Sequence, residues 1–382
     1  MLFGVRPRVL DSLPPTPPGP HLVVDADGHA VEDYDSFLDL LPRALRPLAP
    51  CFEADGTGAA RLVTLEGGSW KPAFNFVLTE DMRRQQLNIG QAATVAVERV
   101  RVLDAEGIDL SVVFPSLGLY FGLYQNASVA AAMCRAENRL LSEWCQQSPS
   151  RLASVAVLPQ QDPHLAATEL ARAVTHDGAI AGMVRPNPSG GKRVDSDDFD
   201  PLWRTAVDLD VPIIFHEGWV GGGCPTLGMD RATSYAAAHA MSHPFEAMSA
   251  ILGIVQGGLL YRFPTLRLGF FEAGCGWAPW WADRIAEHAA LKPTDFPSGL
   301  PCLSKRIWLS FEPSEHAVDW VASRGWASNL CFASDFPHAD ATFPGAVQQV
   351  TARGLPLDLE RRLLGQNALD LFGSRLRSKL VR

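Results

Sequence analysis

The sequence predicts an α/β fold, a (β/α)8 TIM barrel with inserted loops after the first and fifth strands. Two observations predict this fold. Short apolar runs, typical of strands buried on both faces, alternate along the chain with stretches of helical periodicity. Several of these runs also end in a histidine or a carboxylate, as expected where parallel strands end at one mouth of a barrel. The 382 residues, 47% of them hydrophobic, are enough to fill its core.

Eight apolar runs are the expected strands, and a segment with helical periodicity follows each. In chain order the expected strands are Leu22–Asp27, Leu110–Pro115, Leu152–Leu158, Gly182–Arg185, Val211–His216, Leu266–Glu272, Arg306–Phe311 and Leu330–Asp335. The expected helices are Ala92–Glu106, Ala127–Gln147, His164–His176, Phe199–Leu209, Pro244–Tyr261, Ala278–Ala290, Glu315–Ala322 and Ala346–Arg353. No repeat or linker divides the chain, so we expect residues 21–382 to form a single domain.

Segments outside this regular alternation have expected roles of their own. Residues 1–20 are rich in proline and lack the apolar core of a signal peptide, so we expect an arm that wraps its own or a neighbouring subunit. Long excursions follow the first strand and His216. Because long loops in compact domains are usually functional or disordered, we expect these two to form walls or lids of an active site.

Charge and composition exclude several classes of function. The net charge of −9 and the lack of a basic cluster argue against binding to nucleic acid. No run of apolar residues is long enough to span a membrane. The seven cysteines are odd in number and show no C-x-x-C spacing, which indicates reduced thiols in a cytoplasmic protein.

Four potential metal ligands lie at the ends of three expected strands. Asp27 and His29 are two residues apart and so share one face of a strand, while His216 and Asp335 end the fifth and eighth strands. The ordinary alternatives are a histidine satisfied by hydrogen bonds at position 216 and a helix cap or turn residue at position 335. Together the four suit one divalent ion, with zinc expected first and manganese as the alternative.

The chain resembles the amidohydrolase superfamily, in the amidohydrolase-related branch that also holds aminocarboxymuconate-semialdehyde decarboxylase. The resemblance covers residues 22–373. Its motifs are Val24–His29 with Glu32, Gly107–Asp109, Phe114–Ser116, Phe215–His216, Phe263–Pro264, Phe271–Trp277, Ala333–His338 and Asn367–Gly373.

The resemblance implies a role for each candidate ligand. The family's strand-one pair falls on Asp27 and His29, its strand-five histidine on His216 and its strand-eight aspartate on Asp335. In such enzymes that aspartate touches the metal and handles a proton, which makes Asp335 the first candidate for the general base. Asp25 points to the same face one step deeper, where we expect a structural role.

The chain departs from the family pattern at two strand ends. Members with a bridged metal pair use a strand-four lysine, but this strand ends in Arg185, so we expect a single ion. Arg185 is expected either to bind a substrate carboxylate or to form a structural ion pair. Decarboxylases of the branch resemble one another in placing a histidine at the end of strand six, where this chain has Glu272. Glu272 is a candidate proton carrier, and an ion pair with Arg284 is the alternative.

Further candidates lie near the same mouth. His243 precedes Pro244 at an expected helix start, and we take it as a catalytic candidate, with ordinary helix-start chemistry as the alternative. His338 follows Asp335 closely. Trp219 and Trp277 are expected to line a pocket for an aromatic substrate, and packing of helix against barrel is the alternative.

These features predict a metal-dependent hydrolase that acts on a C–N or C–O bond of a small, aromatic molecule such as an amide, ester or lactone. The alternatives are a non-oxidative decarboxylase or C–C lyase, a dehydrative ring closure at the same site, and a non-catalytic barrel. The expected partner is a small-molecule substrate, and the expected assembly is a homodimer. The identity of the substrate depends on the inserted loops, which carry no readable pattern.

Overall fold

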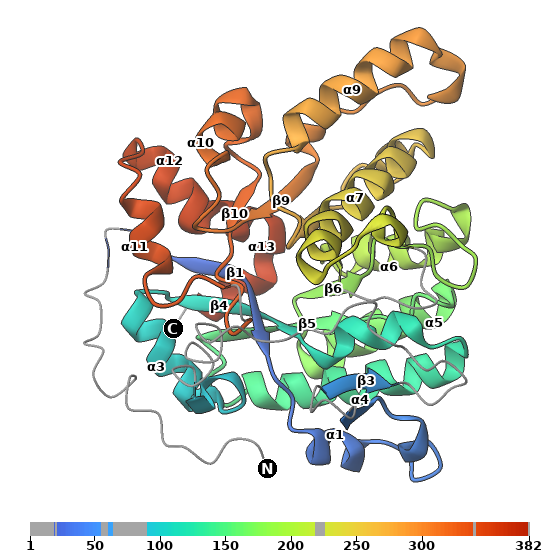
Figure 1. Ribbon diagram of the computed structural model, residues 1–382, viewed down its shortest axis with the longest axis vertical. Coiled ribbons are helices and arrows are strands. Elements are labelled where there is room, and N and C mark those ends of the chain that lie inside the picture. The colour runs from blue at the N-terminus through green and yellow to red at the C-terminus, as the bar shows by residue number, and fades with distance from the viewer. Residues whose placement is uncertain are drawn as a thin grey trace.

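The computed structural model describes residues 19, 21–54, 60–63, 90–217, 226–338 and 341–380. Its centre is an eight-stranded sheet in which every neighbouring pair is parallel (Figure 1). In spatial order the strands are β1 (Val24–Ala30), β4 (Leu110–Pro115), β5 (Leu152–Val157), β6 (Ala181–Val184), β7 (Ile213–His216), β8 (Leu268–Phe271), β9 (Ile307–Phe311) and β10 (Leu330–Phe332). The predicted (β/α)8 barrel and all eight of its strands are confirmed.

The inserted segment after β1 contains the antiparallel hairpin of β2 (Cys51–Ala54) and β3 (Ala60–Val63). The helices are α1 (Tyr34–Leu40), α3 (Ala96–Glu106), α4 (Ala127–Cys145), α5 (Pro163–Arg172), α6 (Asp200–Asp208), α7 (Tyr235–Gln256), α8 (Leu259–Arg262), α9 (Ala278–Leu291), α10 (Val318–Val321), α11 (Ala346–Thr351), α12 (Leu357–Arg361) and α13 (Asn367–Leu380). Of the Pro-rich arm expected over residues 1–20, residues 1–18 and 20 lie outside the described residues.

The start of α7 corrects one prediction. Pro244 was expected to begin a helix, but α7 begins at Tyr235 and Pro244 lies inside it. Ser234 caps the helix by accepting a hydrogen bond from the backbone N–H of Ala237 at 3.3 Å. The alanine-rich run that follows favours helix strongly enough to continue through the proline, although proline removes one backbone hydrogen bond. His243 is therefore a mid-helix residue.

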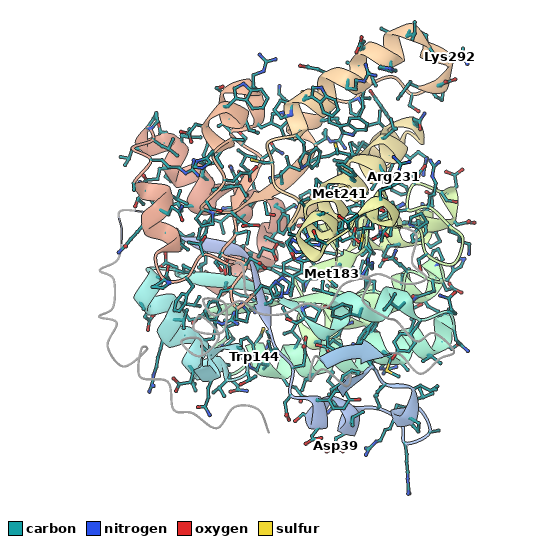
Figure 2. The ribbon with its side chains drawn as sticks, in the orientation of Figure 1. Asp39, Trp144, Met183, Arg231, Met241 and Lys292 are labelled. Atoms are coloured by element: carbon teal, nitrogen blue, oxygen red, sulfur yellow. The ribbon has the colours of Figure 1, made fainter. Side chains whose placement is uncertain are left out.

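Along each strand, successive side chains point alternately into the barrel interior and toward the surrounding helices. On β7, Ile214 belongs to the same buried cluster as Phe271 of β8, whereas Phe215 packs with Trp203 of α6 in the other cluster. His216 therefore shares the inward face with Ile214. Figure 2 shows Met183 of β6 in the middle of the molecule, while Asp39 of α1 and Lys292 at the end of α9 lie toward opposite ends.

The barrel is closed between its first and last strands without a regular ladder among the described residues. The backbone N–H of Asp335 donates to the carbonyl of Asp27 at 2.9 Å, and the N–H of His29 donates to the carbonyl of Phe336 at 2.7 Å. The carboxylate of Asp25 accepts from both the N–H and the hydroxyl of Ser334, at 2.8 and 2.9 Å. We call this set of contacts the seam.

Gly28 lies at an irregularity of β1, where the register with β4 shifts between Asp25 and Gly28. A Cβ atom added at Gly28 would lie 2.7 Å from an oxygen of Asp25 and 2.7 Å from the hydroxyl of Ser111. Only glycine leaves room for the hydrogen bond between those two side chains, at 2.8 Å. Packing at the seam therefore requires glycine at the centre of the Asp-Gly-His triplet, whose outer residues carry the ligand atoms.

The hydrogen bonds that Asp25 accepts from Ser111 and Ser334 stabilise the fold. Asp25→Ala leaves the buried N–H and hydroxyl of Ser334 and the hydroxyl of Ser111 without an acceptor, so we expect a loss on the order of 3 kcal/mol in the free energy of unfolding. Asp25→Asn keeps one acceptor oxygen and should lose less. Urea unfolding followed by circular dichroism measures both, and an alanine variant within about 0.5 kcal/mol of the parent would contradict this role.

Candidate metal centre at the seam

The four predicted ligands converge beside the seam. Asp27 and His29 lie on β1, His216 ends β7, and Asp335 follows β10. His216 Nε2 is 3.4 Å from Asp27 Oδ1, and His29 Nε2 is 3.6 Å from both Asp27 Oδ1 and Asp335 Oδ1. All four side chains are buried. The structure therefore brings together residues from three separate parts of the sequence.

Several polar atoms of this cluster have no hydrogen-bond partner among the described residues. They are both carboxylate oxygens of Asp27, both ring nitrogens of His29 and Nε2 of His216. His216 Nδ1 lies 3.0 Å from the carbonyl of Glu217, which can only accept, so Nδ1 carries the proton and Nε2 presents a lone pair. Buried polar atoms without partners are costly, and a divalent cation satisfies several of them at once. These residues fit a metal ion.

Burial disfavours the charged forms of the Asp27 and His29 side chains. It raises the pKa of Asp27, against the opposing effect of His216, and lowers the pKa of His29 well below its usual range. A neutral imidazole is the form that binds metal, and a nearby dication would favour the ionised form of Asp27. The direction of both shifts therefore matches a site that is completed by a cation.

The backbone is left-handed at two of the strand ends that face this centre. Glu272 and Asp335 have φ angles of 53° and 54°, which are uncommon for residues other than glycine. Glu272 is held there because its N–H donates to the hydroxyl of Ser310 at 2.8 Å. Such conformations cluster at functional sites, where the surrounding structure holds them in place.

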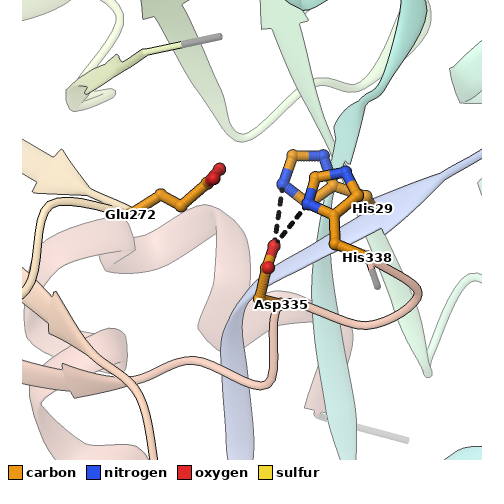
Figure 3. Close-up of side chains that lie close together, drawn as sticks. All are labelled: His29, Glu272, Asp335 and His338. Carbon is orange, nitrogen blue, oxygen red and sulfur yellow. Dashed lines mark ion pairs between the residues drawn. The ribbon is translucent and has the colours of Figure 1, made fainter. Parts of the chain in front are cut away.

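Glu272 lies between two histidines. Its Oε2 is 3.3 Å from His216 Nε2, and its Oε1 is 3.4 Å from His243 Nδ1. Figure 3 shows Glu272 reaching from the end of β8 toward the rings of His29 and His338, with Asp335 paired to both histidines. Arg284, the expected alternative partner, instead pairs with Glu287 at 3.0 Å. This pairing of Arg284, together with the contacts of Glu272 with two histidines, favours the predicted role of Glu272 at the centre over a structural ion pair with Arg284.

His243 and His338 both reach this centre. His243 Nδ1 lies 2.7 Å from the carbonyl of Glu272, and burial lowers the pKa of His243 well below its usual range. His338 Nδ1 is 2.7 Å from Asp335 Oδ1, and its ring centroid is 4.1 Å from that of His29. The sequence placed His243 at the wrong point of its helix, yet its side chain does point at the strand ends.

The structure favours the structural alternatives for two of the three predicted substrate-binding residues. Arg185 is buried, and its two terminal nitrogens donate to Leu119 O at 2.9 Å and Glu217 Oε1 at 2.9 Å. This geometry favours the structural ion pair over binding of a substrate carboxylate. Trp277 packs against the core and its Nε1 donates to the carbonyl of Ala273 at 2.8 Å, which favours the packing alternative. Trp219 lies outside the described residues.

Sequence reasoning missed His239. It lies one helical turn before His243 on α7, and the two ring centroids are 4.9 Å apart. Spacing of four residues on a helix would have placed both on one face. The signal was hidden because Pro244 was taken as the beginning of the helix, which left His239 in a loop.

A comparison with protein families identifies the chain. A model of the amidohydrolase family matches residues 112–374, more than half of the sequence. The chain belongs to the amidohydrolase family. Within the described ranges, every helix is too short or too polar to serve as a membrane span.

Relatives of this amidohydrolase include several decarboxylases. It is 34% identical over 149 residues to decarboxylase orsB of Emericella nidulans, a match that covers 36% of this chain and 44% of the relative. It is 22% identical over 282 residues to 2-amino-3-carboxymuconate-6-semialdehyde decarboxylase of Dictyostelium discoideum, covering 72% of this chain and 76% of that one. The chain thus spans less than half the length of the first relative and about three quarters of the second.

A solved structure has the same fold. Dihydroxybenzoic acid decarboxylase from Polaromonas sp. JS666, with bound manganese and the inhibitor 2-nitroresorcinol, superposes with a TM-score of 0.68 at 19% identity. The superposition covers 95% of this chain and 100% of that one. The relatives agree better with the decarboxylase alternative than with hydrolysis of a C–N or C–O bond, which was the first expectation.

Removal of the metal should destabilise the fold. An ion at about 100 times its Kd stabilises the folded state by about 2.7 kcal/mol, so chelation with EDTA should lower the thermal unfolding temperature. Asp27→Asn should abolish most of that difference because it weakens the centre. Differential scanning calorimetry with and without added zinc or manganese measures this. The alternative result, equal unfolding temperatures for the parent protein in all conditions, would show that no ion binds.

Proposed function

We propose that this member of the amidohydrolase family is a metal-dependent, non-oxidative decarboxylase of a small aromatic carboxylic acid. The observation that carries the proposal is the convergence of unpartnered ligand atoms of Asp27, His29 and His216 beside Asp335. Decarboxylases among the relatives support this choice of reaction over hydrolysis.

Asp27, His29, His216 and Asp335 would hold one divalent ion at the seam. Two imidazole nitrogens and two carboxylate oxygens suit zinc and manganese alike, and the Polaromonas decarboxylase contains manganese. When bound, the ion supplies positive charge that binds the acid and stabilises negative charge that develops on it. The protein's contribution is to fix these ligands before substrate arrives.

The reaction needs a proton at the carbon that loses its carboxylate. The C–C bond to the carboxylate breaks, its electron pair remains on the ring carbon, a C–H bond forms and carbon dioxide leaves. We assign the proton to Asp335, whose Oδ1 lies 2.7 Å from His338 Nδ1. His338 orients this carboxyl group and, at 25% side-chain exposure, connects it to solvent.

Aromatic side chains lie directly behind the ligands. The ring of Phe114 is 5.1 Å from that of His216 and 6.0 Å from that of Phe271. Tyr120 lies within electrostatic range of Glu272 and Arg185, and burial together with Glu272 raises the pKa of its phenol. A neutral phenol at this position can donate a hydrogen bond to a substrate oxygen. Phe114 and Phe271 are fully buried and support the ligand rings from behind, so Tyr120 is the member of this group that suits an oxygenated substrate.

Hydrolysis of a C–N or C–O bond is the second candidate function. Glu272 favours it, because a carboxylate next to His216 can act on a leaving group where a decarboxylase of this branch is expected to have histidine. The two functions differ in their products. Decarboxylation releases carbon dioxide, whereas hydrolysis of an amide or ester releases an amine or alcohol.

A substrate panel with a matched pair of variants tests the proposal. The panel contains hydroxybenzoates and their amides and esters, assayed with added manganese or zinc. We expect carbon dioxide from at least one hydroxybenzoate, and Asp335→Asn should reduce kcat by about 10²- to 10⁴-fold because it cannot carry the proton.

Asp283→Asn is the control, since Asp283 is an exposed residue of α9. Metal content is measured on each variant so that loss of the ion is separated from loss of the proton carrier. Turnover of amides or esters with no release of carbon dioxide from any acid would overturn the decarboxylase proposal in favour of hydrolysis.

A further inference from the structure

A second group of metal-binding side chains adjoins the first. It consists of His239 and His243 on α7 and Glu272 at the end of β8, and each can bring one ligand atom within 4.8 Å of the others. The two histidines are four residues apart on one helix, a spacing that puts both rings on the same face. We call this group the α7 cluster.

His243 is arranged in the same way as His216. The Nδ1 atom of His243 donates to the carbonyl of Glu272 at 2.7 Å, as the Nδ1 atom of His216 donates to the carbonyl of Glu217 at 3.0 Å. In both rings, Nε2 is buried and has no hydrogen-bond partner among the described residues. Histidines that bind metals commonly donate their other ring N–H to a backbone carbonyl or a carboxylate in this way. The unpartnered Nε2 of His243 therefore points to a ligand.

Glu272 faces both groups. Its Oε2 lies 3.3 Å from His216 Nε2, and its Oε1 lies 3.4 Å from His243 Nδ1. One carboxylate oxygen of Glu272 and one ring nitrogen of each histidine of the α7 cluster lie within 4.8 Å of one another, so a cation in this cluster would share Glu272 with the ion at the seam.

We propose that His239, His243 and Glu272 hold a second divalent cation, zinc, beside the ion at the seam. Two imidazoles and one carboxylate with an open position form a set that zinc commonly takes in proteins. The single ion expected from the sequence rested on the lack of a strand-four lysine. Glu272, at the end of a different strand, would take the place of that lysine as the residue common to both groups.

The experiment counts metal ions in the full-length protein. The protein is stripped with a chelator, saturated with zinc sulfate and freed of excess zinc by gel filtration, and bound zinc is measured by inductively coupled plasma mass spectrometry. We expect two zinc ions per chain in the parent protein and one in His239→Ala. Asp27→Asn should lose the ion at the seam and keep the other.

His288→Ala is the matched control, because His288 is an exposed histidine of α9 and should leave the count at two. Circular dichroism verifies folding, and His239→Gln replaces the alanine variant if that one does not fold. One zinc ion in the parent protein, or two in a folded His239 variant, would overturn the proposal and leave the α7 cluster as a polar network without an ion. The count does not depend on turnover, so a failure of the decarboxylase proposal is distinguished from a failure of this one.

Discussion

The seam between β1 and β10 is the constraint on which the metal centre depends. Two backbone hydrogen bonds join Asp27 to Asp335 and His29 to Phe336, so the residues that close the barrel are also the residues that carry ligand atoms. The buried guanidinium of Arg99 adds a hydrogen bond to the carbonyl of His29. Because the scaffold fixes these backbones, the side chains are held in place before any ion or substrate binds.

The geometry of the metal centre lowers the free energy of unfolding. Unpartnered atoms of Asp27, His29 and His216 are buried, and the left-handed conformations of Glu272 and Asp335 cost about 1–3 kcal/mol each. The large apolar core of the barrel offsets these terms, and a bound cation would convert the first of them into favourable interactions. Function and strain therefore occupy the same few strand ends.

Much of the fold could be predicted from the sequence because buried strands have a strong local pattern. All eight strands were found, and the polar residues that end them, His216 and Asp335 among them, indicated one mouth. Tertiary context decided the rest. Pro244 continues a helix that its local signal would begin, and that error concealed His239. The ion pair of Arg185 with Glu217 joins residues that directly follow the neighbouring strands β6 and β7, so it depends on strand pairing and not on a local pattern.

Reaction chemistry is less predictable than the position of the site. The sequence indicated where the ligands meet, but Glu272 alone suggested hydrolysis, while the relatives favour decarboxylation. The structure explains the ambiguity, since Glu272 and Asp335 both face the same ligand atoms and either carboxyl group is placed to carry a proton. The reaction therefore depends on which bond of the bound substrate lies next to Glu272 and Asp335.

The central claim is that the unpartnered atoms at the seam hold a cation. Anomalous diffraction from a crystal grown with zinc, recorded on both sides of the zinc absorption edge, tests it most directly. The account predicts a peak about 2.0–2.2 Å from ligand atoms of Asp27, His29, His216 and Asp335. A fully occupied zinc peak held by other residues, or no peak at the seam under saturating zinc, would contradict it.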